Sequence, residues 1–167
     1  MIKSLLLIRH AQAKTKEPGE KDIDRSLNEA GVMESLRIGR YLSKEEVNIE
    51  QIMTSHARRA FETATLISES LKLDPNKITE LEDLYEASAR TLLDRINQFE
   101  ESFCCVVLIG HNPALTFLGE YLSSQPIGFL PPGGLIWLAF EDMSWENVEK
   151  ETAFLKGTIY PEQLTIS

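Results

Sequence analysis

Three short apolar runs, separated by longer amphipathic stretches, constrain the fold of this chain more than any other feature. The runs cover residues 5–8, 51–54 and 106–109. Runs of this length are typical of parallel strands that are covered on both faces. Between and after them, small or apolar residues recur at helical spacing, in the groups Val32, Leu36, Gly39 and Leu42; Ala60, Ala64, Ile67 and Leu71; Ala89, Leu92, Ile96 and Phe99; and Leu115, Leu118 and Leu122. Strands alternating with helices predict an α/β fold.

The chain is expected to form one domain over residues 1–167. Its 167 residues, 43% of them hydrophobic, suffice for a sizeable core, and the sequence shows no repeat or long linker. After the "PPGG" turn at 131–134, residues 135–140 and 152–158 are predicted to be two further strands, an antiparallel pair at one side of the sheet. The expected architecture is three α/β/α layers around a mixed, mostly parallel central sheet.

Charge and cysteine content narrow the classes of partner. The chain has 17 Lys and Arg against 26 Asp and Glu, a net charge of −9. Nucleic acid and anionic membranes both require a positive surface, so neither is expected as a partner. Cys104 and Cys105 are adjacent and lie in an apolar run, which favours reduced core residues in a cytoplasmic protein. The run 5–8 is too short for a signal peptide or a membrane span.

Cationic and titratable side chains follow the ends of the predicted parallel strands. Arg9 and His10 end the first, Arg58 is expected in the first helical turn after the second with Ser55 as its N-cap, and His111 follows the third. Asn112 can cap the next helix, with Pro113 at its first position. In such folds ligands bind at the carboxyl ends of the strands. The pattern therefore predicts a site for an oxyanion, phosphate above all.

Each of these residues also has a plain structural explanation. A single arginine on a helix commonly forms a surface ion pair, and a histidine after glycine is commonly hydrogen-bonded within the fold. His56 has no placement at a strand end and is interpreted as part of an exposed loop. The chain has three histidines and neither an HxH nor an HExxH motif, so no metal site and no cofactor are expected.

Four segments together resemble the histidine phosphatase superfamily, whose members are phosphoglycerate-mutase-like in fold. They are "LIRHA" near the N-terminus, "DIDRSLNEAG" at 22–31, "SHARRAFETA" at 55–64 and "GHNP" at 110–113. The short chain and the segments "LYEASA" and "FLPPGGL" are similar to the SixA-type phosphohistidine phosphatase branch. The resemblance spans essentially the whole chain, in the family's order.

The resemblance implies a metal-independent phosphatase. In the family the histidine of the Arg-His pair is the nucleophile, so His10 is expected to carry a transient phosphohistidine. Arg9, Arg58 and His111 would supply the charge and hydrogen bonds that the phosphoryl oxygens require, with Asn112 as a further phosphate ligand. A strand that ends on Arg9 and His10 would aim the nucleophile and one cationic ligand together.

Three residues are less fixed by the resemblance. Arg25 is a candidate for contact with the phosphate, or it pairs with Asp24. Ala11 stands where many relatives have glycine, so a positive φ there would be strained. Glu86, in "LYE", loosely matches the proton-donating glutamate of mutase-like members, and the alternative is a solvated loop carboxylate.

Three functions remain open at this point. The first is hydrolysis of phosphohistidine on a phosphorylated protein, such as a histidine-phosphotransfer domain. The second is hydrolysis of a small phosphate ester by the same residues, and the third is phosphate binding without catalysis. No segment is long enough for a large lid, which favours a substrate presented by another protein.

Overall fold

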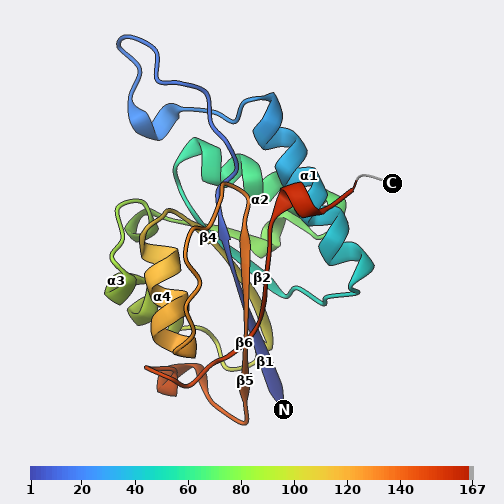
Figure 1. Ribbon diagram of the computed structural model, residues 1–167, viewed down its shortest axis with the longest axis vertical. Coiled ribbons are helices and arrows are strands. Elements are labelled where there is room, and N and C mark those ends of the chain that lie inside the picture. Colours follow the sequence, from blue (N-terminus) through green and yellow to red (C-terminus); the bar gives the residue numbers. More distant parts are fainter. Residues whose placement is uncertain (166–167) are drawn as a thin grey trace.

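The side chains of strand β1 (Ile2–Arg9) alternate between two separate hydrophobic cores. In the computed structural model, which describes residues 1–165, Leu5 and Leu7 belong to one core, and Leu6 and Ile8 to the other. All four side chains are fully buried. The first core includes helices α3 and α4, and the second includes α1 and α2, so the sheet lies between two helical layers (Figure 1).

The sheet has six strands in the order β3-β2-β4-β1-β5-β6. Their bounds are β1 Ile2–Arg9, β2 Gln51–Ser55, β3 Ile78–Leu81, β4 Cys105–Gly110, β5 Leu135–Glu141 and β6 Phe154–Ile159. Strands β1 to β4 run parallel, while β5 is antiparallel to both β1 and β6. The carboxyl ends of β1, β4 and β2 therefore meet at one edge of the sheet.

Within residues 1–165, four α-helices cover the two faces of the sheet. They are α1 Glu29–Lys44, α2 Arg58–Ser70, α3 Ala89–Ile96 and α4 Ala114–Ser123. The described residues also contain five 3-10 helices: η1 Asp22–Asp24, η2 Pro75–Lys77, η3 Glu82–Leu84, η4 Trp145–Asn147 and η5 Pro161–Gln163. The three-layer α/β/α architecture and the antiparallel pair at one side of the sheet are thus confirmed.

Several boundaries differ from the predicted ones. Strand β3 was not expected, because its four residues are only partly buried and lack a continuous apolar run. Strand β6 begins at Phe154 rather than 152. Val32 was expected on the core-facing side of α1 but is 36% exposed. Of the predicted group, Gly39 and Leu42 are buried, and the helix also buries Gly31, Ser35 and Ile38.

Both cysteines are free, as expected. Cys105 is buried and Cys104 is half-buried, and burial raises the pKa of the Cys105 thiol to about 12. Because the thiolate is the reactive form, this pKa favours a structural role for Cys105.

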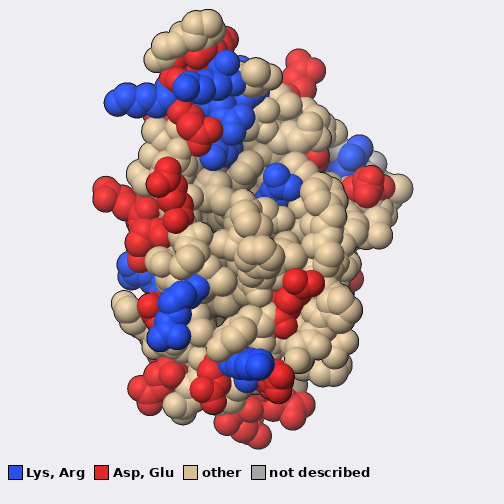
Figure 2. Space-filling view, turned by 60° about the vertical axis from the view of Figure 1, so that its left-hand side comes forward, with Lys and Arg blue, Asp and Glu red and all other residues tan. Residues whose placement is uncertain are grey.

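A long loop, residues 10–28, projects beyond the sheet between β1 and α1 (Figure 1). Its exposed lysines are Lys14, Lys16 and Lys21. Figure 2 shows Lys and Arg side chains gathered at this end of the molecule, whereas Asp and Glu predominate at the opposite end. Within the described residues, no helix is long and apolar enough to cross a membrane.

Candidate active site

Two histidines lie side by side where adjacent parallel strands end. Arg9, the last residue of β1, is in register with Gly110, the last residue of β4, and the His10 N–H donates to the Gly110 carbonyl at 3.1 Å. The next residue of each strand, His10 and His111, therefore reaches the same edge. Their ring centroids are 5.0 Å apart. The sequence prediction that these two residues come together is met by the structure.

The surroundings of His10 fix which of its ring nitrogens is free. Nδ1 lies 2.8 Å from the Ala11 carbonyl oxygen. A carbonyl oxygen can only accept a hydrogen bond, so Nδ1 is the donor and carries the proton. Nε2 therefore has its lone pair, and it accepts from Arg59 Nε at 3.3 Å. Burial, helped by Arg59 and Arg9 and opposed by the bond to Ala11, lowers the pKa of His10 to about 4. At neutral pH His10 is therefore an uncharged imidazole with its lone pair on Nε2.

Arg59, not Arg58, is the arginine of α2 that reaches this site. Arg59 is 5% exposed, and besides His10 it contacts Asp22 through Nη1 to the backbone carbonyl at 2.9 Å and through Nη2 to Oδ2 at 3.1 Å. The side chain of Arg58 is 61% exposed and pairs with Glu62 one turn further along. The expectation for Arg58 is corrected by this placement, since the helix turns its side chain to solvent.

The sequence contained a signal that points to Arg59. The apolar residues Ala60, Ala64 and Ile67 mark the buried face of the helix, and all are fully buried. Successive helical residues are 100° apart, so Arg59 lies one step from Ala60 and Arg58 lies two. Thr63, four residues after Arg59 and also buried, shares its side of the helix. Helix geometry alone therefore favours Arg59 for a site against the sheet.

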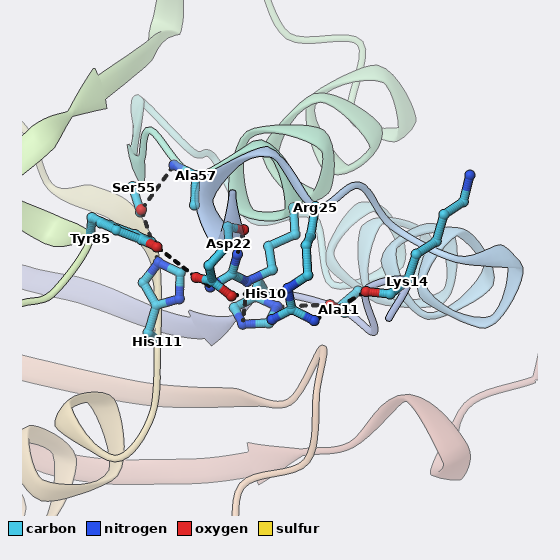
Figure 3. Close-up of polar contacts among 10 residues, drawn as sticks. His10, Ala11, Lys14, Asp22, Arg25, Ser55, Ala57, Tyr85 and His111 are labelled. Carbon is cyan, nitrogen blue, oxygen red and sulfur yellow. Dashed lines mark hydrogen bonds and ion pairs between the residues drawn. The ribbon is translucent and has the colours of Figure 1, made fainter. Parts of the chain in front are cut away.

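His111 is held by Ser55 at the end of β2. The Ser55 hydroxyl is 2.9 Å from His111 Nε2 and accepts the Ala57 N–H at 3.2 Å (Figure 3). Ser55 is fully buried. It was predicted to be the N-cap of α2, but the N-cap position is Ala57. Burial, with smaller effects of His10 and Arg59, lowers the pKa of His111 to about 3. His111 is therefore also neutral at pH 7.

Asn112 turns toward its own helix. Its Oδ1 accepts from the N–H and the hydroxyl of Thr116, and its Nδ2 donates to the Leu130 carbonyl at 3.4 Å. Asn112 Oδ1 thus accepts an N–H in the first turn of α4, but the prediction that Asn112 is the N-cap and Pro113 the first helical residue is wrong, since the N-cap position is Pro113 and α4 begins at Ala114. No contact of Asn112 with His10 or Arg59 is found among residues 1–165.

Arg9 lies beside the same carbonyl. Its Nη1 donates to Leu130 O at 2.9 Å, while its Nε is buried without a hydrogen-bond partner among residues 1–165. Burial lowers the pKa of Arg9 from its usual value, but an arginine remains charged at neutral pH. Arg9 therefore brings a positive charge, with donors left to satisfy, next to His10.

Asp22, in the projecting loop, joins the site from the opposite side. Its Oδ2 accepts from Tyr85 at 2.6 Å and from Arg59, and its Oδ1 accepts from Arg25 Nε at 3.0 Å (Figure 3). The Tyr85 bond is the largest cause that lowers the pKa of Asp22 to about 2, with Arg59 and Arg25 adding to it against desolvation. Arg25 pairs with Asp22, not with Asp24 as the structural alternative predicted.

Tyr85, rather than Glu86, is the residue of "LYE" that enters the site. Its ring packs edge-on against His111, with centroids 5.6 Å apart, and Arg59 lies 6.0 Å from its centroid. Glu86 is exposed and forms no side-chain hydrogen bond or ion pair within the described part of the chain. The structure therefore gives Glu86 no contact with His10.

Two further expectations are settled by the geometry. His56 is half-buried rather than exposed, because its ring packs edge-on against Tyr85 at 5.7 Å. Ala11 is fully buried, does not have a positive φ, and donates its N–H to Thr63 at 3.1 Å. The alanine is thus accommodated without backbone strain. In the described range 1–165, no group of three His, Cys, Asp or Glu side chains is arranged to hold a metal ion.

The assembled site is a neutral imidazole, that of His10, surrounded by guanidinium groups. Arg9, Arg25 and Arg59 bring three positive charges, Asp22 brings one negative charge, and His111 adds a neutral ring. Such an arrangement can bind a dianionic phosphoryl group and attack its phosphorus atom.

Solved structures share this architecture. The chain matches a protein assigned as the phosphohistidine phosphatase SixA of Nakamurella multipartitia with a TM-score of 0.84 at 19% identity, covering 96% of this chain and 97% of that one. It matches the protein assigned as SixA of Agrobacterium tumefaciens with a TM-score of 0.81 at 26% identity, covering 95% and 98%. The protein histidine phosphatase SixA complexed with tungstate gives a TM-score of 0.81 at 20% identity, covering 96% and 98%.

Sequence comparison agrees at the level of the family. None of the curated proteins matches the chain. The family model of the histidine phosphatase superfamily, branch 1, matches residues 5–103, which is more than half of the chain. Together with the paired histidines at the strand ends, this match shows that the chain belongs to the histidine phosphatase superfamily, branch 1.

Proposed function

We propose that the protein is a cytoplasmic phosphatase, acting as one domain, that removes the phosphoryl group from phosphohistidine on a partner protein. The observation that carries this proposal is that the carboxyl group bonded to Arg59 and Arg25, that of Asp22, is ionised. Asp22 has a pKa of about 2, so it is ionised at neutral pH and has no proton to give. Glu86 is exposed and forms no hydrogen bond with His10 in the described residues.

The absence of a protonated carboxyl group beside His10 within residues 1–165 distinguishes two classes of substrate. An alkoxide that leaves from an ordinary phosphate ester is a strong base and needs a proton from a general acid in the transition state, a contribution of about 10²- to 10⁴-fold. Imidazole is a far better leaving group and does not need that proton. A site of strong positive charge without a poised acid therefore favours the P–N bond of phosphohistidine over a P–O bond to an alkyl group.

The reaction would proceed through His10. The Nε2 lone pair forms a bond to phosphorus while the P–N bond of the substrate breaks and its electron pair returns to the substrate imidazole. A substrate imidazole that is protonated on its other nitrogen leaves neutral, and phosphorylated His10 keeps its Nδ1 proton, so the net charge is conserved. Water then bonds to phosphorus, the bond to Nε2 breaks, and dihydrogen phosphate departs with both water protons.

The surrounding side chains have distinct roles in this proposal. Arg9 and Arg59 neutralise the phosphoryl oxygens, with Arg25 further out, and His111 contributes a ring hydrogen bond. Arg59 takes the role that the sequence prediction gave to Arg58. The Ala11 carbonyl holds His10 in the tautomer with the proton on Nδ1 and the lone pair on Nε2.

Rapid-quench labelling with a phosphohistidine-bearing protein tests the intermediate. We expect an acid-labile, base-stable label on His10, located by peptide mapping, and none in His10→Asn. Label on a serine, on a carboxylate or on His56 would contradict the mechanism.

The substrate class is tested separately, by kcat/KM on phosphohistidine protein and on an alkyl phosphate. Wild type should prefer the former, and Glu86→Gln should slow it by less than roughly tenfold, because imidazole needs no general acid. Preference for the alkyl phosphate, with equal damage to both reactions by Glu86→Gln, would favour a small-ester phosphatase instead.

A further inference from the structure

A carboxylate sits inside a group of residues that otherwise suits an anion. Asp22 bonds to Arg59 and Arg25, two of the guanidinium groups that would face a phosphoryl dianion. A negative charge at this position repels such a ligand. Removing that repulsion would need only a neutral residue, so the carboxylate calls for an explanation beyond phosphate binding.

The carboxylate retains room for one more partner. An ionised carboxylate offers about four acceptor positions. Tyr85 and Arg59 fill two on Oδ2, and Arg25 fills one on Oδ1. The Asp22 side chain is 48% exposed, so solvent or a ligand can reach it. The remaining acceptor position is therefore available to a donor that arrives with the substrate.

Tyr85 holds this carboxylate next to the histidines. Its hydroxyl donates to Asp22 Oδ2 at 2.6 Å, while its ring packs against His111. Asp22 is thus hydrogen-bonded to Arg59, whose Nε contacts the nucleophilic Nε2 of His10. It is also hydrogen-bonded to Tyr85, which contacts the second histidine, His111. Figure 3 shows Asp22 between Tyr85 and Arg25, close to His10.

We propose that Asp22 is a specificity-determining residue that accepts a hydrogen bond from the ring N–H of the phosphohistidine substrate, with Tyr85 as its positioning residue. The inference rests on the proposed function. When His10 takes the phosphoryl group, the substrate P–N bond breaks and its electron pair neutralises the imidazolium, whose other nitrogen keeps its proton and donates it in a hydrogen bond to Asp22. Asp22 stabilises the protonated, readily leaving form of the ring.

The same charge disfavours phosphate esters. An alkyl or aryl phosphate has neither the positive charge nor the N–H that would satisfy Asp22. The Asp22 carboxylate therefore repels it, and no hydrogen bond offsets the repulsion. Asp22 therefore separates the two substrate classes by opposite electrostatic effects. A role confined to positioning Arg59 would instead affect both classes alike, and this difference makes the proposal testable.

The experiment compares kcat/KM of wild type, Asp22→Asn and the matched control Asp24→Asn, an exposed carboxylate of the same 3-10 helix. The substrates are free phosphohistidine, a phosphohistidine-bearing protein and p-nitrophenyl phosphate. We expect Asp22→Asn to lower the ratio of phosphohistidine to p-nitrophenyl phosphate kcat/KM by roughly 10- to 100-fold, the usual range for a hydrogen bond to a charged group. Asp24→Asn should leave the ratio unchanged.

Two results would overturn the proposal. One is an equal fall on all substrates, which would assign Asp22 to positioning Arg59. The other is a change confined to the protein substrate, which would assign Asp22 to protein docking, since a contact with the ring must also appear with free phosphohistidine. Tyr85→Phe, which keeps the ring, should shift the ratio in the same direction by a smaller factor. Failure of wild type to hydrolyse phosphohistidine would instead refute the proposed function.

Discussion

Arg58 and Arg59 are neighbours in the chain with opposite surroundings, and they offer a matched pair of substitutions. Arg59→Ala removes a buried guanidinium next to His10 Nε2, so we expect kcat/KM to fall by about 10²- to 10³-fold, the scale for losing one transition-state donor. Arg58→Ala removes a solvent-exposed ion pair, which typically contributes about 0 to 1 kcal/mol to stability. Its kcat/KM should stay within about twofold of wild type.

Steady-state kinetics of both variants, with circular dichroism to verify folding, measure this difference. A large loss of activity in Arg58→Ala with a normal Arg59→Ala would reverse the assignment of the two residues. Because Arg59 also bonds to Asp22, part of the loss could arise from the loop. Asp22→Asn, which breaks the Arg59–Asp22 ion pair but keeps both Arg59 and His10, separates the two contributions.

At the scale of elements, the first turn of α1 packs directly against the backbone of the loop after β1. Gly31 lies in the first turn of α1, where a Cβ atom would meet the Gln12 carbonyl oxygen at 2.1 Å. Gln12 follows Ala11 and His10 directly, and its carbonyl accepts the Asn28 N–H at 3.1 Å. Any side chain at residue 31 must therefore push α1 away from the segment that carries His10.

Gly31→Ala sets two effects against each other. Helix propensity favours alanine by about 1 kcal/mol, whereas forcing a methyl group into a packed site typically costs about 1 to 3 kcal/mol. A contact at 2.1 Å with backbone cannot be relieved by a side-chain rotation, so we expect net destabilisation and reduced kcat/KM. Urea unfolding measures the change in stability, with the exposed Ala30→Ser as control. A more stable Gly31→Ala variant would show that the loop yields easily.

The elements show where sequence reasoning succeeds. The apolar runs locate β1, β2 and β4 because doubly covered strands need continuous hydrophobic side chains, and parallel strands bring His10 and His111 to one edge. Asp22 and Tyr85 could not be placed in this way. They reach the site from a loop and from the segment after η3, 63 residues apart, and only tertiary folding brings them within 2.6 Å.

At the scale of the whole molecule, the two site histidines link stability to pH. The pKa values of His10 and His111 are about 4 and about 3, below the usual value of 6.5 in an unfolded chain. Between pH 6.5 and about 4 the unfolded state therefore binds more protons than the folded state, so stability rises with pH in this window. As the pH falls from 6.5 to 4, the free energy of unfolding decreases progressively, because the unfolded chain protonates both histidines while the folded state keeps them neutral.

Substitution of both histidines should reduce this acid sensitivity. We expect the double variant His10→Asn, His111→Asn to lose less of its free energy of unfolding between pH 7 and pH 4.5 than wild type does, because neither side chain then has to stay neutral in the folded state. Urea denaturation at the two pH values measures the difference. Asp22 contributes little in this window, since its pKa of about 2 shifts its own stabilising effect to below about pH 4. Equal losses in both proteins would show that the histidines titrate normally in the fold. In that case His10 would be largely protonated below neutral pH, and kcat/KM would fall on the acid side near pH 6.5 instead of near 4.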